Sequence, residues 1–263
     1  MNTTMKTKIP LSIAIVAMNE EATIRRCLES ALFADDIVLV DSHSIDRTPE
    51  IAREYGCRVF IEDWKGDGAQ INSAIEKCKN EWVLVLDADE QVPEDTREEL
   101  IRWISKPKTV EAYRLPRRNY FHGKVIKGCD WWPDEVVRLI KKGTGHYESL
   151  SHKRWESSSA PGTIFLPLEH YSYNNYSDLL TMMESRSNIM AQELYDEGKR
   201  ARITDPLFHG IGMFLKLYLL KRGILDGFDG LIICLARATG SFFKYAKLWE
   251  LQNHWEWVHP PRK

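Results

Sequence analysis

Residues 11–89 alternate between two kinds of hydrophobic pattern, and this alternation limits the possible folds more than any other feature. Four apolar runs have the composition of β-strands, and the segments between them have the spacing of amphipathic helices. Strands that alternate with helices are joined by right-handed crossovers and form a parallel sheet. We therefore predict an α/β fold with a mostly parallel central sheet flanked by helices, whose first strands are 11–18, 36–41, 57–62 and 82–89.

The last of these strands ends in two carboxylates. Its run Val83–Leu86 has no polar position, which predicts a central strand covered on both faces. Asp87 and Asp89 follow, and residues two apart on an extended chain point the same way. A divalent cation would remove their repulsion, and oxygen ligands suit Mg²⁺ or Mn²⁺. The alternative is a solvated loop before a helix, since Pro93 and the residues after it make a good helix start.

Polar clusters follow all four strands. In chain order they read "AMNEE", "VDSHSIDRT", "EDWKGDG" and "DADE". In open parallel sheets, ligands bind at the carboxyl ends of the strands, so we expect the four clusters to line one shared site. A carboxylate pair beside groups that can hold a base and a ribose suits a nucleoside diphosphate bound through a metal. The metal would neutralise the departing diphosphate.

The chain changes character after Pro93. We predict a helix at 94–105, a β-hairpin or mixed sheet at 113–143, a strand at 163–173 and a long helix at 177–198. From Asp205 onward the sequence is rich in Leu, Phe and Trp, with Lys and Arg interspersed. These patterns predict a second, helical part of the chain over residues 176–263.

Charge and cysteine content narrow the possible functions. The net charge is −2 and the isoelectric point is near 6.5, so the average composition does not indicate a nucleic-acid binder. The five cysteines are scattered without metal-ligand spacing, which is typical of reduced thiols in a cytosolic protein. Asn19 and Glu20 directly follow the first apolar run, which argues against a cleaved signal peptide. No segment reaches the roughly 18 apolar residues that a membrane span needs.

A set of motifs in fixed order gives the sequence a family resemblance. They are "SIAIVAMNEEATIRRCLESALFADDIVLVDSHSIDRTPEIA", "DADE", "WWPDEVVRLIKK", "HYSYNNYSDLL" and "YLLKRGILDGFDGL", which span nearly the whole chain. The sequence resembles the family 2 inverting glycosyltransferases with the Rossmann-like GT-A fold, in particular the lipopolysaccharide-core β-1,4-glucosyltransferase branch. The resemblance implies a GT-A catalytic domain over residues 1–175 with a helical C-terminal extension over 176–263. It also implies transfer of a sugar, glucose from UDP-glucose, to a lipopolysaccharide inner-core heptose or a related lipid-linked acceptor, with Mg²⁺ or Mn²⁺ as cofactor.

The resemblance also assigns residues to the donor site. It places Asn19 and Glu20 near the nucleotide, Asp41 beside the uracil ring, Asp87 against the ribose or the metal, and Asp89 on the metal. Many relatives have a second Asp where this chain has Ser42, so the atom that reads the base stays open. Asp41 could instead be a turn residue, and Asn19 and Glu20 could cap a helix.

An inverting transfer needs one further carboxylate as general base. The candidates are Asp134, Glu135, Glu148 and Glu156. We favour Asp134, because Trp131 and Trp132 precede it and could stack on a sugar, and Arg138 follows it. The alternative is that both Trp side chains belong to the core and that Asp134 caps a turn.

Three more residues are candidates for contacts with the metal or the diphosphate. His170 could complete the metal shell through an imidazole nitrogen, although a lone histidine can equally be structural. Lys65 and Arg138 could contact the diphosphate or could be ordinary surface charges.

The tail predicts an interfacial surface. Basic residues alternate there with Leu, Phe, Tyr and Trp, as in helices that lie on anionic lipid; they are Lys216, Lys221, Arg222, Lys244 and Lys247. This pattern predicts a cytoplasmic protein bound peripherally to the cytoplasmic face of the inner membrane. A helical appendage that packs on the catalytic domain or on a second subunit has the same composition.

Two other functions share parts of this pattern. Sugar nucleotidyltransferases have a related α/β architecture, but they grip triphosphate with a Gly-rich first loop, and "AMNEEATI" contains no Gly. A non-catalytic, membrane-recruited nucleotide-sugar-binding protein would keep the metal pair but would not need Asp134.

Overall fold

The computed structural model describes residues 8–148 and 154–253, which fall into two compact units. The first unit comprises residues 1–120 and 133–172, and the second comprises 121–132 and 173–263. The sequence pattern predicted one boundary, at 175/176. The structure changes units close to that point, and it adds the segment 121–132 to the second unit. The catalytic and membrane-associating roles given to the two parts stay predictions.

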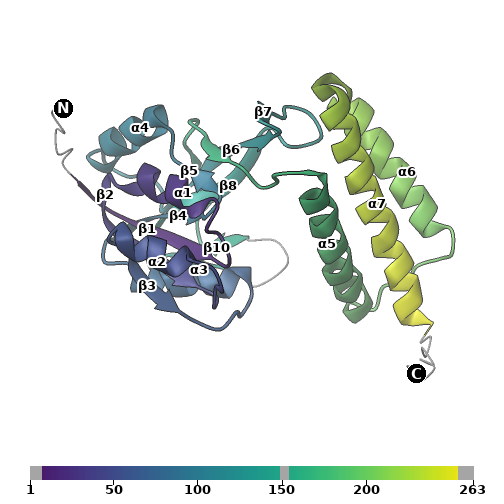
Figure 1. Ribbon diagram of the computed structural model, residues 1–263, viewed down its shortest axis with the longest axis horizontal. Coiled ribbons are helices and arrows are strands. Elements are labelled where there is room, and N and C mark those ends of the chain that lie inside the picture. The colour runs from purple at the N-terminus through teal and green to yellow at the C-terminus, as the bar shows by residue number, and fades with distance from the viewer. Residues whose placement is uncertain (1–7, 149–153, 254–263) are drawn as a thin grey trace. The chain divides into compact units, whose positions relative to one another are not determined.

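The first unit is built on the predicted strand–helix alternation. Strands β1 to β4 are parallel neighbours in the order β3-β2-β1-β4 (Figure 1). The strands are β1 (Ile9–Ala17), β2 (Ala34–Asp41), β3 (Arg58–Ile61) and β4 (Trp82–Asp87). The helices of this unit are α1 (Ile24–Ala31), α2 (Thr48–Glu54), α3 (Asp67–Lys77) and α4 (Glu94–Ile104). The prediction of a central sheet flanked by helices is confirmed.

The sheet continues beyond β4 as a mixed sheet in the order β4-β8-β6-β12-β5. Strand β8 (Asp134–Lys141) is antiparallel to β4 and to β6 (Ala112–Phe121), which confirms the mixed sheet predicted at 113–143. Strand β12 (Leu168–His170) runs parallel to β6, and β5 (Glu90–Gln91) pairs with β12 in the antiparallel sense. The predicted strand at 163–173 is therefore two short pieces, β11 (Gly162–Thr163) and β12. Strands β9 (Gly145–Tyr147) and β10 (Trp155–Ser157) form a separate pair.

Strand β4 lies in the centre of the sheet and is buried on both faces. Leu84 and Leu86 pack in a cluster with residues of α1, α2 and α4, whereas Val83 and Val85 pack with residues of α3. Full burial of such a side chain stabilises the fold by about 1.5–3 kcal/mol. The absence of a polar position in this strand is thus explained by its two covered faces, and Asp87 is the residue at its carboxyl end.

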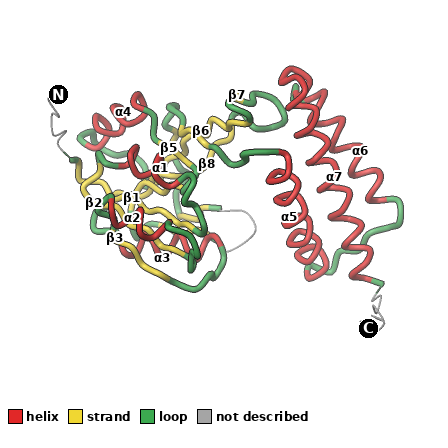
Figure 2. Tube along the Cα trace, in the orientation of Figure 1, coloured by secondary structure: helices red, strands yellow, loops and turns green. Residues whose placement is uncertain are grey.

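The second unit is helical. It contains β7 (Lys124–Val125), α5 (Tyr176–Asp196), α6 (Asp205–Leu215), the π-helix η1 (Lys216–Leu220), the 3₁₀-helix η2 (Gly223–Asp226) and α7 (Gly227–Gln252). Helix α7 packs against both α5 and α6 (Figure 2). The Asn175 side chain caps α5 by accepting a hydrogen bond from the Asp178 amide at 2.9 Å. Among the described residues, no helix combines the length and the apolar character that crossing a membrane requires.

Candidate active site

The carboxylate at the end of β4 faces a buried arginine. Asp87 Oδ2 lies 2.5 Å from a guanidinium nitrogen of Arg138, which comes from the adjacent strand β8. The same guanidinium nitrogen lies 2.6 Å from Oε1 of Glu90, the last residue of "DADE". Arg138 is 1% exposed and Glu90 is fully buried. Charges this deeply buried are stable only when they are paired, so these three side chains hold one another in place.

The burial of Arg138 excludes the alternative that it is an ordinary surface charge. Burial opposes its charge, but the carboxylates of Asp87 and Glu90 raise the pKa of Arg138 well above its usual value. One guanidinium nitrogen contacts both carboxylates, whereas the buried Nε has no hydrogen-bond partner in the described part of the chain. Arg138 is therefore a buried counter-ion of Asp87 and Glu90, and its predicted contact with the diphosphate stays a prediction.

Arg117 links this buried group to Asp134. One guanidinium nitrogen of Arg117, on β6, lies 3.3 Å from Glu90 Oε1 and 3.8 Å from Asp87 Oδ2. The other two donate to Asp134 Oδ2 at 2.7 and 2.9 Å. Arg117 and Asp134 are direct partners in the β6–β8 register, which explains why residues far apart in sequence meet here. We call Asp87, Glu90, Asp134, Arg117 and Arg138 the carboxylate–arginine cluster.

The other base candidates lie elsewhere in the first unit. Glu135 is exposed, and its position next to Asp134 on a strand points it to the opposite face. Glu148 and Glu156 both pair with Arg154, at 3.3 and 2.5 Å. Among the four candidates, Asp134 is the one that joins the cluster at the end of β4. Its role as a base stays a prediction.

Asp89 faces His170. Asp89 Oδ2 lies 3.4 Å from His170 Nε2. His170 Nδ1 lies 2.5 Å from Asn119 Oδ1, and Asn119 donates through Nδ2 to Asp134 Oδ2 at 3.2 Å. The Ser172 hydroxyl lies 2.8 Å from Nε2 of the same ring, so this nitrogen faces both Asp89 and Ser172.

The geometry around Asp89 suits part of the predicted metal site. Two ligands on one octahedral cation, each about 2.1 Å from it, lie roughly 3 Å apart, which is close to the spacing of Asp89 and His170. The predicted third ligand, Asp87, is instead held by Arg138 and Arg117. No group of three His, Cys, Asp or Glu side chains suited to a metal occurs in the described part of the chain. The protein would therefore supply two ligands, and substrate oxygens or water would supply the others.

The loops after β1 and β2 are tied together by hydrogen bonds. Asp41 is fully buried, and its carboxylate accepts from the Ser44 amide at 2.8 Å and from the Ser44 hydroxyl at 2.5 Å. The side-chain oxygen of Asn19 accepts from the Ile45 backbone amide at 2.9 Å, and the backbone amide of Asn19 donates to Ser44 Oγ at 2.8 Å. Asp41 thus has the turn role that the sequence left as an alternative. Its predicted contact with uracil stays a prediction.

Ser42 and Lys65 were also considered as donor-site positions from the sequence. Ser42 is buried, and its hydroxyl accepts a hydrogen bond from Gln70 Nε2 at 2.9 Å. Lys65 is exposed in the loop between β3 and α3, and its predicted diphosphate contact stays a prediction.

Glu20 lies close to the carboxylates at the end of β4. Burial raises its pKa, the hydrogen bond from Thr23 lowers it, and the charges of Asp89, Asp46 and Asp87 raise it, so that it ends above its usual value of 4.5. The Thr23 hydroxyl donates to Glu20 Oε2 at 2.6 Å. A raised pKa means that the ionised carboxylate is less stable in the folded protein than in the unfolded chain. A bound cation would relieve this repulsion.

We expect Glu20→Gln to raise the melting temperature of the metal-free protein near neutral pH. The amide can still accept from Thr23, and it removes the repulsion from Asp89 and Asp87. Because the wild-type carboxyl is protonated in both the folded and the unfolded state below pH 4.5, the gain should vanish there. Calorimetry across this pH range measures the effect. Exposed Glu98, replaced by Gln, is the control and should change little. A gain from Glu20→Gln that is equal at acidic and neutral pH would contradict the assignment.

Three residues of the site, Glu90, Arg117 and Asn119, were not predicted from the sequence. Glu90 stands inside the "DADE" motif, and a carboxylate four residues before the start of helix α4 gives no signal that it is buried. Arg117 and Asn119 lie in a basic stretch that reads as a surface strand. Their roles depend on the register between β6, β8 and β12, which places them beside Asp134 and His170.

Comparison with known proteins gives consistent results. Residues 12–142 match the Glycosyl transferase family 2. The lipopolysaccharide core biosynthesis glycosyltransferase LpsC of Rhizobium meliloti (strain 1021) is 29% identical over 257 residues, which cover 92% of this chain and 93% of LpsC. Two solved structures share the fold at a TM-score of 0.50. S. aureus TarS in complex with UDP-GlcNAc is 13% identical, with 95% of this chain and 93% of that chain covered. Mannosyltransferase PcManGT from Pyrobaculum calidifontis, in complex with GDP-Man and Mn²⁺, is 15% identical, with 94% and 88% covered.

Proposed function

The chain carries a glycosyl transferase family 2 domain over residues 12–142, and from this premise we propose that it transfers glucose from UDP-glucose to a lipopolysaccharide inner-core heptose or a related lipid-linked acceptor. The observation that carries the proposal is the arrangement at the carboxyl end of β4. There the Asp89–His170 pair and the carboxylate of Asp134 are joined through Asn119. The likeness to LpsC over nearly the full length of both chains supports the acceptor class.

The residues of this site would divide the work of an inverting transfer. Asp89 and His170 would hold a divalent cation, which when bound supplies positive charge to the leaving diphosphate. PcManGT binds Mn²⁺ together with a nucleotide sugar, which supports this cofactor class. Asp134 would accept the proton of the acceptor hydroxyl while that oxygen attacks the anomeric carbon from the side opposite the diphosphate. Arg117 and Asn119 would orient the Asp134 carboxylate through their hydrogen bonds.

A donor screen tests this function. Purified protein is incubated with UDP-glucose, UDP-GlcNAc and GDP-mannose in the presence of Mn²⁺, Mg²⁺ or EDTA, and nucleotide release is measured with and without a heptose-bearing acceptor. We expect fastest release from UDP-glucose, dependent on a divalent cation and stimulated by the acceptor. Formation of pyrophosphate from a nucleoside triphosphate and a sugar phosphate would instead identify a nucleotidyltransferase. Binding of UDP-glucose without turnover under any condition would favour a non-catalytic protein.

The second unit has a surface that supports peripheral membrane binding. Helix α6 exposes Leu207, Phe208, Ile211 and Leu215, whose spacing puts them along one side of the helix. Leu219, Leu220 and Leu225 continue the exposed apolar residues through the two short helices. Lys216, Lys221 and Arg222 are exposed in the same segment. We include in the proposal that this segment, residues 205–226, rests on the anionic cytoplasmic leaflet where a lipid-linked acceptor is held.

We expect the protein to co-sediment with anionic vesicles at low salt and to be released as salt rises. A basic residue near an anionic surface contributes about 1 kcal/mol, and salt screens this attraction. Replacing Lys216, Lys221 and Arg222 together by Gln should weaken vesicle binding and leave hydrolysis of a soluble donor unchanged. Lys221 pairs with Asp130 at 2.8 Å, so we expect its share to be the smallest of the three.

The matched control removes the same charge from the first unit. Arg25, Arg53 and Lys106 are exposed helix or loop residues there, and their replacement by Gln should leave vesicle binding unchanged. If both triple variants bind like the wild type, or if neutral and anionic vesicles bind equally, then the tail is a packing or subunit interface.

A further inference from the structure

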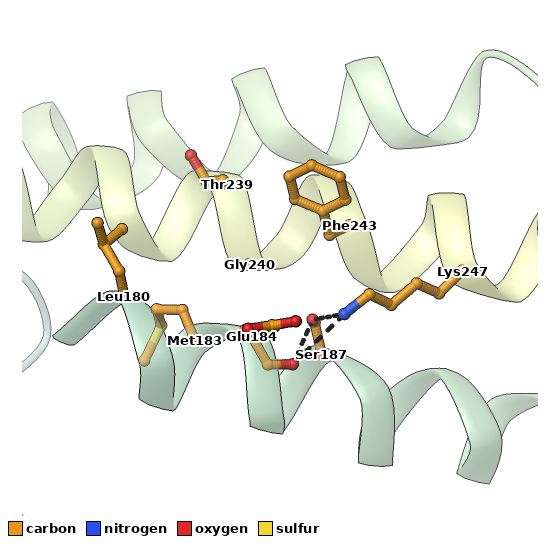
Figure 3. Close-up of a pocket in the computed structure, with 8 residues that line it drawn as sticks. All are labelled: Leu180, Met183, Glu184, Ser187, Thr239, Gly240, Phe243 and Lys247. Atoms are coloured by element: carbon orange, nitrogen blue, oxygen red, sulfur yellow. Dashed lines mark hydrogen bonds between the residues drawn. The ribbon is translucent and has the colours of Figure 1, made fainter. Parts of the chain in front are cut away.

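A groove runs along the second unit between α5 and α7, and none of the candidate active-site residues lines it. Its volume is about 300 Å³. Leu180, Met183 and Ser187 line it from α5, and Gly240, Phe243 and Lys247 line it from α7 (Figure 3). At about 30 Å³ per water-sized group, this volume holds roughly ten groups of the size of a methylene.

One end of the groove is apolar. Leu180 and Phe243 are 53% and 47% exposed, so about half of each side chain is left for a ligand to cover. Gly240 has no side chain to occupy the groove, and a Cβ at this position would lie 3.5 Å from the Cβ of Met183, which is an ordinary van der Waals contact. From Leu180 to Ser187 the helix rises about 10 Å at 1.5 Å per residue, which is the length of a short stretch of acyl chain.

The other end of the groove is polar and carries both signs of charge. The ammonium group of Lys247 donates to Ser187 Oγ at 2.8 Å and to the backbone carbonyl of Glu184 at 3.5 Å (Figure 3). Ser187 is buried, and the Glu184 side chain also lines the groove. No ion pair of Lys247 is found within the two described ranges, and both hydrogen bonds of its ammonium group go to neutral oxygens. A ligand anion could approach the ammonium group, and a ligand cation could approach Glu184.

We propose that this groove binds one acyl chain of a zwitterionic phospholipid. The chain lies along Leu180, Met183 and Phe243, the phosphate faces Lys247, and the ammonium group of the head faces Glu184. Charge complementarity at the polar end favours a zwitterion over a fatty acid, which would meet Glu184, and over a cationic amphiphile, which would meet Lys247. This inference goes beyond the proposed transfer reaction, because it needs neither donor, metal nor acceptor sugar.

Calorimetric titration with a single-chain lysophosphatidylethanolamine, kept below its micelle concentration, tests the proposal. We expect saturable binding, tighter than that of a fatty acid or an alkyltrimethylammonium ion of matched chain length. Thr239 is exposed and lines the groove, so Thr239→Trp should fill it and weaken binding more than about tenfold. Thr181 is exposed on α5 outside the groove, and Thr181→Trp is the matched control, which should bind like the wild type.

The charged end has its own test. Lys247→Gln and Glu184→Gln should each weaken binding of the zwitterion, by about two- to fivefold for a partly exposed charge pair. Glu184→Gln should at the same time tighten binding of the fatty acid. Phe243→Ala removes an exposed wall of the groove and should also weaken binding, which provides a second variant if Thr239→Trp does not fold.

Three results would overturn the proposal. The first is the absence of saturable lipid binding to the wild type, and the second is equal lipid affinity of Thr239→Trp and Thr181→Trp. The third is a wild-type dimer that Thr239→Trp dissociates, because a second copy of the chain would then occupy the groove. UDP release from a soluble donor and acceptor, measured on the same variants, should be unchanged. Failure of the groove and failure of the proposed transfer reaction are therefore separate outcomes.

Discussion

Asp89→Ala will abolish sugar transfer, with a loss in kcat/KM of about a thousandfold or more. The carboxylate of Asp89 faces Nε2 of His170 at 3.4 Å, and together they are the two protein ligands that the structure offers to a cation. Without one of them the charge that stabilises the departing diphosphate is lost, a contribution of several kcal/mol. Steady-state assays with UDP-glucose over a range of Mn²⁺ concentrations measure the loss.

Two further variants test whether the loss of activity in Asp89→Ala is due to loss of the metal. Asp89→Glu keeps a carboxylate at a shifted position and should leave partial activity that responds to higher Mn²⁺. Glu98→Ala removes an exposed carboxylate from α4 and should behave like the wild type. Wild-type turnover in Asp89→Ala, or full activity of the wild type in EDTA, is incompatible with a cation held at this position.

Asp134→Asn will keep donor binding and lose transfer. The amide has nearly the same shape as the carboxylate and can still accept from Arg117, but it cannot take up the proton of the acceptor hydroxyl. Loss of a general base costs roughly 10² to 10⁴ in rate. The expected result is a fall in kcat of that size with an unchanged Kd for UDP.

A neighbouring carboxylate gives the matched control. Glu135→Gln removes the adjacent exposed carboxylate on the opposite face of the strand and should keep the wild-type kcat. If UDP affinity collapses in Asp134→Asn while bound donor turns over normally, then Asp134 belongs to the donor site and another group is the base.

The apolar runs were sufficient to predict the first half of the fold. Val83–Leu86 could only be a strand covered on both faces, and the structure places it in the middle of the sheet. The position of Asp87 at the end of the strand was predicted for the same reason, and Asp87 is the last residue of β4. Local pattern was enough here because each strand is determined by its own residues and by the helices next to it in sequence.

The partners of those carboxylates could not be predicted from the sequence. The spacing of Asp87 and Asp89 suggested one shared cation, but the chain turns after Asp87 and Glu90 enters the short strand β5. Asp87 then faces Arg138 and Asp89 faces His170, residues that lie 51 and 81 positions later in the chain. The separation depends on the register of β8 and β12, which is set by packing between distant segments.

The role of Asp41 could not be predicted from the sequence either. An aspartate in "DSHS" fits both a turn and a contact with a nucleobase, and the sequence does not distinguish the two roles. In the structure both of its carboxylate oxygens accept hydrogen bonds from Ser44, which fixes the loop that also binds Asn19. Asp41 therefore shapes the loop of the proposed nucleotide site, and direct recognition of the base is a separate question that UDP binding to Asp41→Asn addresses.

The most direct test of the proposed function is the configuration of the product. Wild-type protein is incubated with UDP-glucose, Mn²⁺ and a heptose-bearing core acceptor, and the new glycosidic linkage is analysed by NMR. UDP-glucose carries its sugar in the α configuration, so in-line attack assisted by Asp134 predicts a β-linked glucoside formed in step with UDP release and abolished by EDTA. An α-linked product, or UDP release without any new glycosidic bond, would contradict an inverting glucosyl transfer at this site.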